Sequence, residues 1–518
     1  AIGSAALTVN TTGAENTAVG SLALDANTSG TMNNALGYSA LSANSGGNYN
    51  NAFGRSALAS NSSASNNSAF GHGALSANTT GAKNVAVGAL SLDANTEGEE
   101  NTAVGYLALS ANTTADANTA FGVQSLMVNT TGSLNAAFGA AALDANTTGS
   151  NNTAMGYGSL TGNTTASNNT AVGYLSLAAN TTGTSNTAVG ESALAANTTA
   201  SNNAAFGQDA LAKNTEGHSN TGVGLAALEE NTTADANTGI GFKALNKNTT
   251  ASNNTAVGYA ALKVNTTGTA NTAVGALSLD ANTTGFYNVA VGYAALSAVN
   301  QSYNTAVGYN ALGAATSGQQ NTAMGYFSLP VMTTALYNTA IGLQSGRDCT
   351  TGSDNVFVGY RAGDGPSPSG SITTQSNRIV MGNNSATHAY IRVSWTVTSD
   401  KRDKADVEPL IMGLDLVNKL EPITYKWDMR SDYEDGKPDG THKKEKLHGG
   451  LLAQDVEKLE REYGYKVEDE TSILTDKNAD GNYGLQYDKF VPVLINAVKE
   501  LSSQVDELKA EIQTLKGE

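Results

Sequence analysis

The sequence is poor in charge, in aromatic residues and in cysteine, and each shortage excludes a class of protein. Charged residues make up 14% and aromatic residues 6% of the chain, whereas globular proteins usually carry about 25% charged residues. The single cysteine, Cys349, allows no intrachain disulfide. The net charge of −17 offers no basic surface for phosphates, so we expect no nucleic-acid partner. No apolar run approaches the ~18 residues that a membrane span needs, so we expect no span.

Charge and proline are also unevenly distributed along the chain. Residues 1–359 contain 7 Lys and Arg, 17 Asp and Glu, and only one of the seven prolines, Pro330. The remaining residues hold most of both charge types. This asymmetry indicates two regions of different chemistry that join near residue 360.

A strict repeat of 17 residues fills the first region. One glycine recurs from Gly3 to Gly292 with this spacing, then at Gly308 after one coil that is a single residue shorter, and again from Gly325 to Gly359. Asn stands four residues before each of these glycines except Gly3, which lies too close to residue 1. Leu stands four residues after each of them as far as Leu329. Gly346 and Gly363 replace the last two leucines, which indicates that the repeat degenerates there.

The repeat predicts a parallel β-solenoid. Seventeen extended residues trace roughly 55 Å, which suits a flattened coil with two short strands and two corners. The block Asn-Thr-Ala-Val-Gly-Tyr alternates, so Ala and Gly should face one way and Val and Tyr the other. Stacked coils should share a core of Leu, Val and Ala, together with ladders of Asn. A glycine and several Asn and Thr in every coil disfavour a helical repeat.

The same block resembles the head repeats of trimeric autotransporter adhesins, although the family's repeat is shorter than the one in this chain. The resemblance covers residues 1–359 and implies a trimeric, left-handed parallel β-roll. Because Ala1-Ile2-Gly3 already lie inside the repeat, we expect an N-terminal anchor to a tail or particle before residue 1.

Several motifs of the shaft suggest binding sites, but each has a structural interpretation. Gly222-Val223-Gly224 and Gly239-Ile240-Gly241 resemble dinucleotide loops yet lack the third glycine, so we expect no cofactor. The Asn-Thr-Thr triplets match glycosylation sequons and also form coil corners, the interpretation we favour. The isolated histidines predict no metal site. A tyrosine often follows the repeat glycine, and this stripe could stack on sugars or serve packing; its members are Tyr38, Tyr106, Tyr157, Tyr174, Tyr259, Tyr293, Tyr309 and Tyr326.

A junction follows the shaft. We expect a shaft at residues 1–363 and a linker and β-strand junction at 364–398. Residues 364–375, rich in Gly, Pro and Ser, should form the linker itself. Residues 377–382 and 390–397 have the composition of strands.

The C-terminal region, residues 399–518, shows a recognisable order of blocks. It begins with Ser-Asp-Lys-Arg-Asp-Lys at 399–404, followed by an amphipathic helix around 410–420 and the block Glu-Pro-Ile-Thr-Tyr-Lys-Trp at 421–427. Gly-Leu-Leu-Ala-Gln-Asp-Val at 450–456 and a heptad tail follow. These blocks resemble the self-cleaving intramolecular chaperone domain of endosialidases and other phage tail fibres and tailspikes.

The resemblance implies a cis-acting peptidase without an external substrate. It assigns Ser399 as nucleophile and Lys404 as general base, with the bond between Thr398 and Ser399 cleaved. A serine hydroxyl is a weak nucleophile that needs a nearby base, and a lysine serves only where its surroundings lower its pKa. Lys401 and Arg402 could act as such cationic neighbours. The alternative interpretation of this segment is a charged turn.

The tail predicts self-association. Apolar residues recur there at spacings of 4 and 3, which indicates a coiled coil over about 490–516; they are Leu494, Val498, Leu501, Val505, Leu508, Ile512 and Leu515. Val and Ile at one core position with Leu at the other favour two strands, whereas the family implies a homotrimer. Residues 476–481 fit only half of a calcium loop, because position 12 is Tyr487, so we expect a polar hairpin turn and no metal.

These features lead to one functional hypothesis and two alternatives. We expect a phage tail-fibre protein, in the virion or otherwise extracellular, that attaches to a host receptor, for which a glycan is one candidate. The first alternative is a secreted bacterial adhesin or injection-system fibre with the same chaperone. A carbohydrate-degrading tailspike is disfavoured because the shaft's acidic residues form no obvious catalytic pair.

Overall fold

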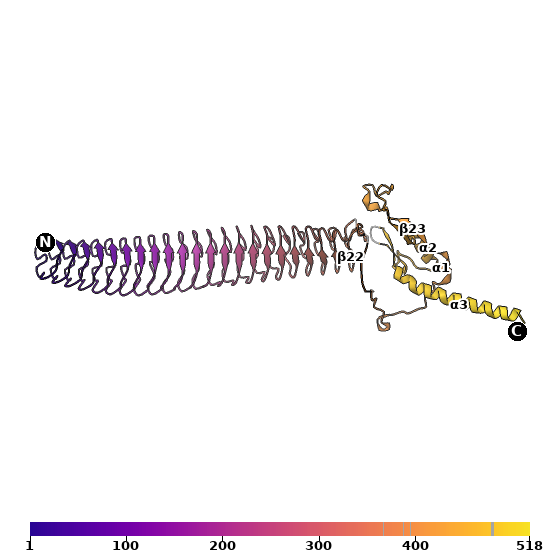
Figure 1. Cartoon of the computed structure of the whole chain (residues 1–518), viewed down its shortest axis with the longest axis horizontal. Helices are drawn as coiled ribbons and strands as arrows, with labels where there is room; N and C mark the ends of the chain where they lie inside the picture. The colour runs from indigo at the N-terminus through magenta and orange to yellow at the C-terminus, as the bar shows by residue number, and fades with distance from the viewer. Residues whose placement is uncertain (366, 387, 394, 478–480, 518) are drawn as a thin grey trace. The chain divides into compact units, whose positions relative to one another are not determined.

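The structure is a computed structural model that describes residues 1–365, 367–386, 388–393, 395–477 and 481–517. The chain divides into two compact units, Ala1–Tyr326 and Phe327–Glu518. The first unit is a stack of coils that each contribute one short strand (Figure 1). Its strands are β1 (Thr17–Val19), β2 (Asn34–Leu36), β3 (Asn51–Phe53), β4 (Ser68–Phe70), β5 (Val85–Val87), β6 (Thr102–Val104), β7 (Thr119–Phe121), β8 (Ala136–Phe138), β9 (Thr153–Met155), β10 (Thr170–Val172), β11 (Thr187–Val189), β12 (Ala204–Phe206), β13 (Thr221–Val223), β14 (Thr238–Ile240), β15 (Thr255–Val257), β16 (Thr272–Val274), β17 (Val289–Val291), β18 (Thr305–Val307) and β19 (Thr322–Met324).

Consecutive strands of this unit pair in parallel. Ala18 lies opposite Ala35, and Ala171 lies opposite Ala188, so the register advances by one repeat at each step. The short coil keeps the ladder intact, because Ala290 still pairs with Ala306 although one residue is missing between them. The predicted parallel β-solenoid is confirmed.

The core of each coil consists of alanine, leucine and asparagine. Ala18 and Leu24 are fully buried. Asn33, also buried, donates from Nδ2 to the carbonyl of Gly47 over 2.8 Å. A second asparagine row uses its side chains as rungs, with Asn44 Nδ2 donating to Asn27 Oδ1 over 2.9 Å. The predicted asparagine ladders are therefore present, and they satisfy buried polar groups from coil to coil.

The valine position differs from the prediction. Ala103 in β6 is fully buried, but the third residue of a strand faces outward, as Phe121 does with 54% of its surface exposed. The alternation of the strand was predicted correctly, whereas the inclusion of valine in the core was wrong. Ala and Leu fill the narrow interior without it.

The predicted second strand of each coil is absent throughout the first unit, all of which is described. Ala23 and Leu24 are adjacent, yet both are fully buried, which the alternating pleat of a strand forbids. Leu22 and Leu24 have φ of 61° and 49°, a left-handed conformation that costs about 1–2 kcal/mol per residue. Hydrogen bonds offset this cost, such as the one from Leu24 N to Ala40 O over 3.0 Å.

The repeat glycine allows two coils to approach closely. At Gly20, φ is 132°, and a Cβ atom would lie 2.4 Å from the carbonyl oxygen of Gly37. Any side chain at this position would push neighbouring coils apart. The strict glycine period is therefore a packing requirement.

The second unit begins with three more strands, β20 (Thr339–Ile341), β21 (Val356–Val358) and β22 (Ile379–Met381). The pair β21–β22 keeps the parallel register across a longer connection than the repeat provides, with Phe357 opposite Val380. The ladder therefore continues to Met381, beyond the predicted shaft end at 363. The strand predicted at 377–382 is confirmed.

The predicted linker at 364–375 is instead an enlarged coil among its described residues. Ile372 is buried, and Thr350 N donates to Thr373 O over 2.8 Å. The fully buried Asp364 accepts from Arg347 Nη2 over 2.7 Å and from Arg361 Nε over 2.5 Å. Two guanidinium groups thus compensate the desolvation of the carboxylate, and the coil closes despite its Pro and Ser content.

The two glycines that replace leucine make room for one large side chain. Phe357 occupies the alanine position of β21 and is fully buried. A Cβ atom at Gly346 would lie 2.9 Å from the Phe357 ring, and one at Gly363 would lie 2.4 Å from it. The coils at Gly346 and Gly363 are therefore compensated in size, and the 17-residue spacing ends directly after them, where Val356 pairs with Ile379.

The C-terminal part of the second unit is small and mixed. Its elements are η1 (Lys401–Asp403), α1 (Leu414–Lys419), β23 (Ile423–Lys426), η2 (Arg430–Asp432), β24 (Leu447–Gly450), α2 (Ala453–Glu462), β25 (Thr475–Lys477), β26 (Tyr483–Leu485), η3 (Tyr487–Lys489) and α3 (Phe490–Leu515). The pairs β23–β24 and β25–β26 are antiparallel. The second pair brackets the predicted polar turn, in which residues 478–480 lie outside the described residues. The helix predicted around 410–420 is shorter, because it begins only at Leu414.

The strand predicted at 390–397 does not form in the described residues 390–393 and 395–397. Tyr390 and Trp395 are 90% and 74% exposed. A period-two pattern gives only the tendency to form a strand, and a stable strand also needs a neighbour to pair with.

Candidate active site in the C-terminal region

The predicted nucleophile and base flank one turn. Asp400 caps this turn, because its Oδ1 accepts a hydrogen bond from Arg402 N over 2.9 Å. Lys404 N then donates to Lys401 O over 3.4 Å. The chain reverses direction across η1, and this brings the side chains on either side of the turn together.

The structure joins the two predicted catalytic side chains. Lys404 Nζ donates a hydrogen bond to Ser399 Oγ over 2.6 Å. This distance lies within the reach needed for proton transfer between a nucleophile and its base. The predicted scissile bond joins the carbonyl of Thr398 to the amide nitrogen of Ser399. The hydroxyl that would attack this carbonyl therefore belongs to the next residue in the chain. The arrangement can support attack by a serine on its own preceding carbonyl.

The prediction that Arg402 acts as a cationic neighbour of the lysine is not supported. Its Nη2 donates to Asp400 Oδ2 over 2.6 Å, and its Nε donates to Asp400 Oδ1 over 3.1 Å. The hydrogen bond from the Arg402 side chain lowers the pKa of the Asp400 carboxyl. Asp400 therefore balances the charge of Arg402 locally. Ser399 and Lys404 are also both exposed to solvent.

A compact apolar cluster forms the core of the part of the second unit that begins at about residue 410. Met412, Leu416, Val456, Leu474 and Val493 are buried together, with Phe490 at the edge. These residues come from the segment before α1, from α1, α2 and α3, and from the segment before β25. The sequence analysis predicted helices around 410–420 and over the heptad tail, but it predicted neither α2 nor which elements pack together.

Glu460 organises the segment before β25 and was missed by the sequence analysis. It is fully buried, and its carboxylate accepts from Ile473 N over 2.8 Å and from Leu474 N over 2.7 Å. Ser472 Oγ and Thr475 N add bonds of 2.7 and 3.0 Å. Backbone donors thus satisfy a buried charge. A lone Glu in an amphipathic helix gives no sequence signal for this role.

Two residues of α3 hold the start of α1 and were also missed. Glu500 Oε2 accepts from Leu414 N over 2.7 Å, and Asn496 Nδ2 donates to Leu410 O over 2.8 Å. Gly413 leaves the space that the Glu500 carboxylate needs. A carboxylate at the first turn of a helix satisfies an otherwise unpaired donor.

Helix α3 presents two apolar faces. Phe490, Val493 and Ala497 are buried, and the first two belong to the cluster. The predicted heptad residues instead face solvent, and Leu501 and Val505 are 49% and 40% exposed. At the start of the helix, an open apolar groove is lined by Val491, Leu494, Ile495, Val498 and Lys499. The predicted helix over 490–516 is confirmed, whereas self-association along its exposed face stays a prediction.

Several rings of the tyrosine stripe of the shaft stack on one another. Tyr309 stacks on Tyr293 and on Tyr326, with ring centroids 5.3 and 5.2 Å apart. A ring covered on both sides has no open face for a sugar. These contacts favour the packing interpretation.

The sequon asparagines face the interior of the coil. Asn197 is fully buried, and its Nδ2 donates to Asn180 Oδ1 over 2.9 Å and to Ala200 O over 3.0 Å. A glycan on this nitrogen would have to break both hydrogen bonds. The corner interpretation of the Asn-Thr-Thr triplets is therefore supported.

The structure gives two further negative observations for its described residues. They contain no group of three or more His, Cys, Asp or Glu side chains placed to hold a metal ion. Among the helices in these same ranges, even α3 with its 26 residues lacks the apolar stretch of a membrane span.

A repeat solenoid followed by a small α+β region with a Ser-Lys contact defines a fibre-like protein with a specialised C-terminal domain. Residues 399–465 match the family Peptidase_S74, described as chaperone of endosialidase. This match confirms the predicted resemblance and supports a tail-fibre-type protein with an intramolecular, self-cleaving chaperone. Comparisons with curated proteins and with solved structures gave no match.

Proposed function

We propose that the chain is a phage tail-fibre protein whose C-terminal domain trimerises it, assists folding of the solenoid and is then released by self-cleavage. The observation that carries the proposal is the 2.6 Å contact between Lys404 Nζ and Ser399 Oγ. This contact lies within the residues that match the chaperone family. The exposed heptad face of α3 supports self-association of the same domain.

The proposed cleavage proceeds in two balanced steps. After Lys404 has lost its own proton to solvent, it takes the proton of the Ser399 hydroxyl, and Oγ attacks the carbonyl carbon of Thr398. The carbon–nitrogen bond breaks, the nitrogen takes up the proton, and an ester joins Thr398 to Ser399 Oγ. Water then hydrolyses this ester, which leaves a carboxylate on Thr398 and a free amino terminus on Ser399. Lys404 acts as the base in the first step and can activate the water in the second.

The uniformity of the shaft explains why it needs a chaperone. Ala171 pairs with Ala188 just as Ala18 pairs with Ala35, so a slip by one whole coil leaves nearly the same contacts. Long parallel pairings also form slowly, because loop closure precedes the contacts that reward it. A C-terminal nucleus fixes the register, and its removal traps the assembled fibre kinetically.

In this proposal the fibre works outside the host cell, in a virion, and contacts a surface receptor. The irregular short coil is our candidate for that contact, because its aromatic side chains cluster. Tyr303 stacks on Tyr287 at 5.6 Å and meets Phe286 edge-on at 5.3 Å, and all three are exposed. A secreted adhesin or an injection-system fibre is the alternative setting for the same architecture.

The test of the proposal is a denaturing gel of purified full-length protein beside Ser399→Ala. The wild type should give two bands that correspond to residues 1–398 and 399–518, and the variant a single full-length band. Asp403→Ala, on the same turn, is the matched control and should cleave as the wild type does. Cleavage that persists in Ser399→Ala would contradict the assigned nucleophile.

A further inference from the structure

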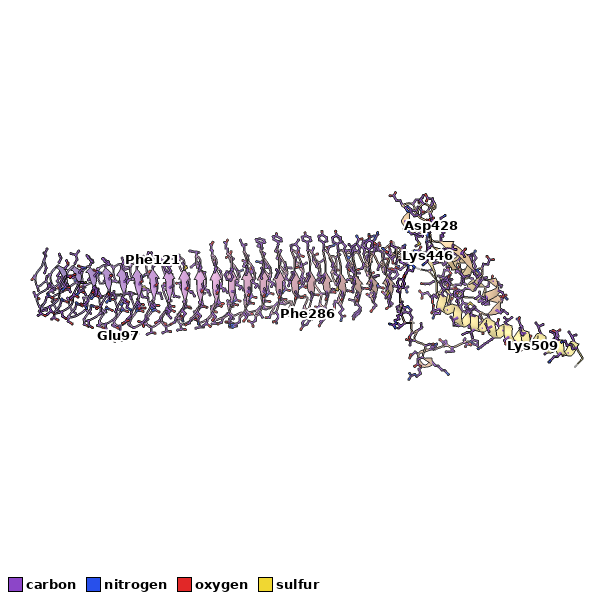
Figure 2. The ribbon with its side chains drawn as sticks, viewed as in Figure 1. Glu97, Phe121, Phe286, Asp428, Lys446 and Lys509 are labelled. Atoms are coloured by element: carbon purple, nitrogen blue, oxygen red, sulfur yellow. The ribbon has the colours of Figure 1, made fainter. Side chains whose placement is uncertain are left out.

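We propose that the aromatic cluster of the short coil, defined as Phe286, Tyr287 and Tyr303, binds the ring of an uncharged sugar on the outer face of Tyr287. The inference rests on the proposed function, because it assumes that the shaft contacts a receptor. It goes further by assigning the chemical class of that receptor, a neutral glycan. Figure 2 shows Phe286 at the margin of the stack of coils.

The three rings leave the outer faces of both tyrosines open. The ring centroids of Tyr287 and Tyr303 are 5.6 Å apart, and that of Phe286 lies 5.5 Å from the first and 5.3 Å from the second. This triangle places Phe286 beside the stacked pair, not over the outer face of either ring. Tyr287 and Tyr303 accordingly remain 57% and 50% exposed.

An alanine leaves room for a further ring on the outer face of Tyr287. Tyr287 is the fifth residue before its repeat glycine, and Ala270 holds this position in the preceding coil. The two coils are in contact there, because Tyr287 N donates to Thr269 O over 3.1 Å. Neighbouring coils lie about 4.8 Å apart, and the Ala270 methyl group fills little of its level. A ligand ring beyond this methyl group would continue the stack that Tyr303 and Tyr287 begin.

The stability of the coil does not explain the phenylalanine. In most coils the sixth residue before the glycine is polar, and its side chain often accepts a hydrogen bond from the preceding coil. Ser252 Oγ accepts from Asp235 N over 3.0 Å, and Ser302 Oγ accepts from Phe286 N over 3.0 Å. Phe286 has no side-chain acceptor, so it forfeits the equivalent bond, and it is still 38% exposed. An exposed aromatic residue at this cost is better explained by binding.

The surroundings of the cluster in the sequence carry no charge. Residues 281–346 contain no Asp, Glu, Lys, Arg or His. A charged sugar would lose hydration there without gaining an opposite charge, whereas the hydroxyl groups of a neutral sugar need only dipolar partners. The net charge of −17 further disfavours an anionic ligand. The composition therefore favours a neutral ligand.

Glutamine amides beside the cluster supply dipolar partners. Gln320 holds the position of Tyr303 in the next coil, and Gln319 precedes it. Gln319 Nε2 donates to Gln301 Oε1 over 2.8 Å. Within residues 1–365, all of which are described, Gln319 Oε1 and Gln301 Nε2 have no further hydrogen-bond partner. One acceptor and one donor side by side match adjacent sugar hydroxyl groups, which both accept and donate.

A sugar ring also suits the open aromatic face. The face of an aromatic ring carries partial negative charge, and the axial C–H groups of a pyranose are apolar and weakly positive. The hydroxyl groups of the sugar point outward from its rim, toward water and the amides. A planar aromatic ligand would stack equally well but would leave the glutamine amides unused.

The test measures binding of the full-length protein to immobilised polysaccharides on a biosensor. The neutral probes are dextran, mannan, galactan and soluble chitin fragments, and the acidic probe is polygalacturonate. We expect binding to at least one neutral probe and none to polygalacturonate. Stronger binding to polygalacturonate would overturn the neutral class, and binding to none of the probes would overturn the sugar site.

Substitutions at Tyr287 test the position of the site. Tyr287→Leu should weaken binding by about tenfold or more, because it removes the ring and keeps an apolar side chain. Leu134 holds the same coil position with φ of 62°, close to the 55° of Tyr287, so the backbone suits a leucine. Tyr287→Phe keeps the ring and should bind about as tightly as the wild type. Equal binding by Tyr287→Leu and the wild type would overturn the assigned site.

Tyr49→Leu is the matched control. Tyr49 holds the same coil position and is 52% exposed, but its neighbours at this position in the adjacent coils are Met32 and Asn66. Its replacement should leave sugar binding unchanged. An equal loss in Tyr49→Leu and Tyr287→Leu would overturn the assignment to the short coil.

The sugar measurement depends on neither cleavage nor self-association, so its failure is distinguishable from failure of the proposed function. A protein that cleaves and self-associates but binds no probe overturns this inference and leaves the fibre and its chaperone. A protein that binds sugar through Tyr287 but neither cleaves nor self-associates overturns the proposed function and supports the site. Sedimentation of Tyr287→Leu as a smaller species than the wild type would assign the cluster to contact between chains and overturn the sugar site.

Discussion

The side chains of Lys404 and Ser399 meet across a single turn, with Lys404 Nζ 2.6 Å from Ser399 Oγ. The neighbouring cation Arg402 is engaged by Asp400, so it does not compete for the serine. The same turn therefore holds an ion pair, Arg402 with Asp400, beside the candidate catalytic contact of Lys404 with Ser399. This relationship makes specific predictions about which residues of the segment matter.

Lys404→Met should abolish release of the 399–518 fragment. Removal of a general base typically lowers a rate by about 10²–10⁴-fold, and Met keeps the length of the side chain. Lys401→Met removes a charge of the same sign on the same turn and is the control. Time courses on denaturing gels should show cleavage in the control and none in Lys404→Met; equal rates would contradict the assigned base.

Charged substitutions on the exposed face of α3 should prevent self-association of the chain. Leu501→Glu combined with Leu508→Glu places like charges along the predicted seam, where identical helices would approach. Ser503→Glu combined with Ala510→Glu adds the same charge to the opposite side. Sedimentation velocity should show a trimer for the control and a monomer for the seam variant. A stable dimer of the wild type would favour the heptad rule over the family's trimer.

Phe357→Ala should destabilise the last coils of the solenoid by about 3–5 kcal/mol, the usual cost of truncating a buried phenylalanine. Gly346→Leu alone should also destabilise them, since its side chain would collide with the Phe357 ring. The measurement is the denaturant midpoint of the full-length protein, with limited proteolysis to locate the opening.

The volume lost in Phe357→Ala and the volume added by leucine at the two glycines should compensate each other. Phe357→Ala with Gly346→Leu and Gly363→Leu restores the alanine and leucine positions of the earlier coils. Gly346 has φ of 62°, close to the 48° of Leu329, so the backbone already suits a leucine there. A triple variant less stable than Phe357→Ala would show that size exchange is not the reason for the glycines.

Cys349 should be unreactive in the folded protein. Burial raises the pKa of its thiol to about 11, so almost none is present as the nucleophilic thiolate at pH 8. A thiol reagent at that pH should label no cysteine under native conditions and one per chain after denaturation. Rapid labelling of the native protein would mean that the coil around Cys349 opens.

The repeat could be predicted because its physical causes are local and repeated. The glycine that permits close approach at Gly20 and the buried Asn33 recur in every coil, and their period is the register of the ladder. The second side of the coil could not be predicted. Its left-handed Leu24 contradicts intrinsic preference and is stable only because neighbouring coils bond to it.

Signals for the end of the solenoid were present but were weighed wrongly. The change to Phe357 in the alanine position coincides with the change to Gly346 in the leucine position, and together these indicate compensation. The Gly, Pro and Ser content of 364–375 led to the prediction of a linker. The apolar Ile372 argues against a linker, but its burial depends on the tertiary fold.

The candidate site was predictable only in part. Ser399 and Lys404 came from the resemblance to a family, and the geometry of the turn agrees with it. The pairing of Arg402 with Asp400 is a local feature that their spacing already permits. The supporting roles of Glu460 and Glu500 depend on contacts with residues distant in sequence, which a single sequence does not reveal.

The most direct measurement of the central claim is the intact mass and N-terminal sequence of the small fragment from fully assembled wild-type protein. The account predicts a fragment that spans residues 399–518 and begins with Ser399, together with its absence from Ser399→Ala. A chain that remains full-length after assembly, or a fragment that begins at another residue, would contradict self-cleavage at the Thr398–Ser399 bond.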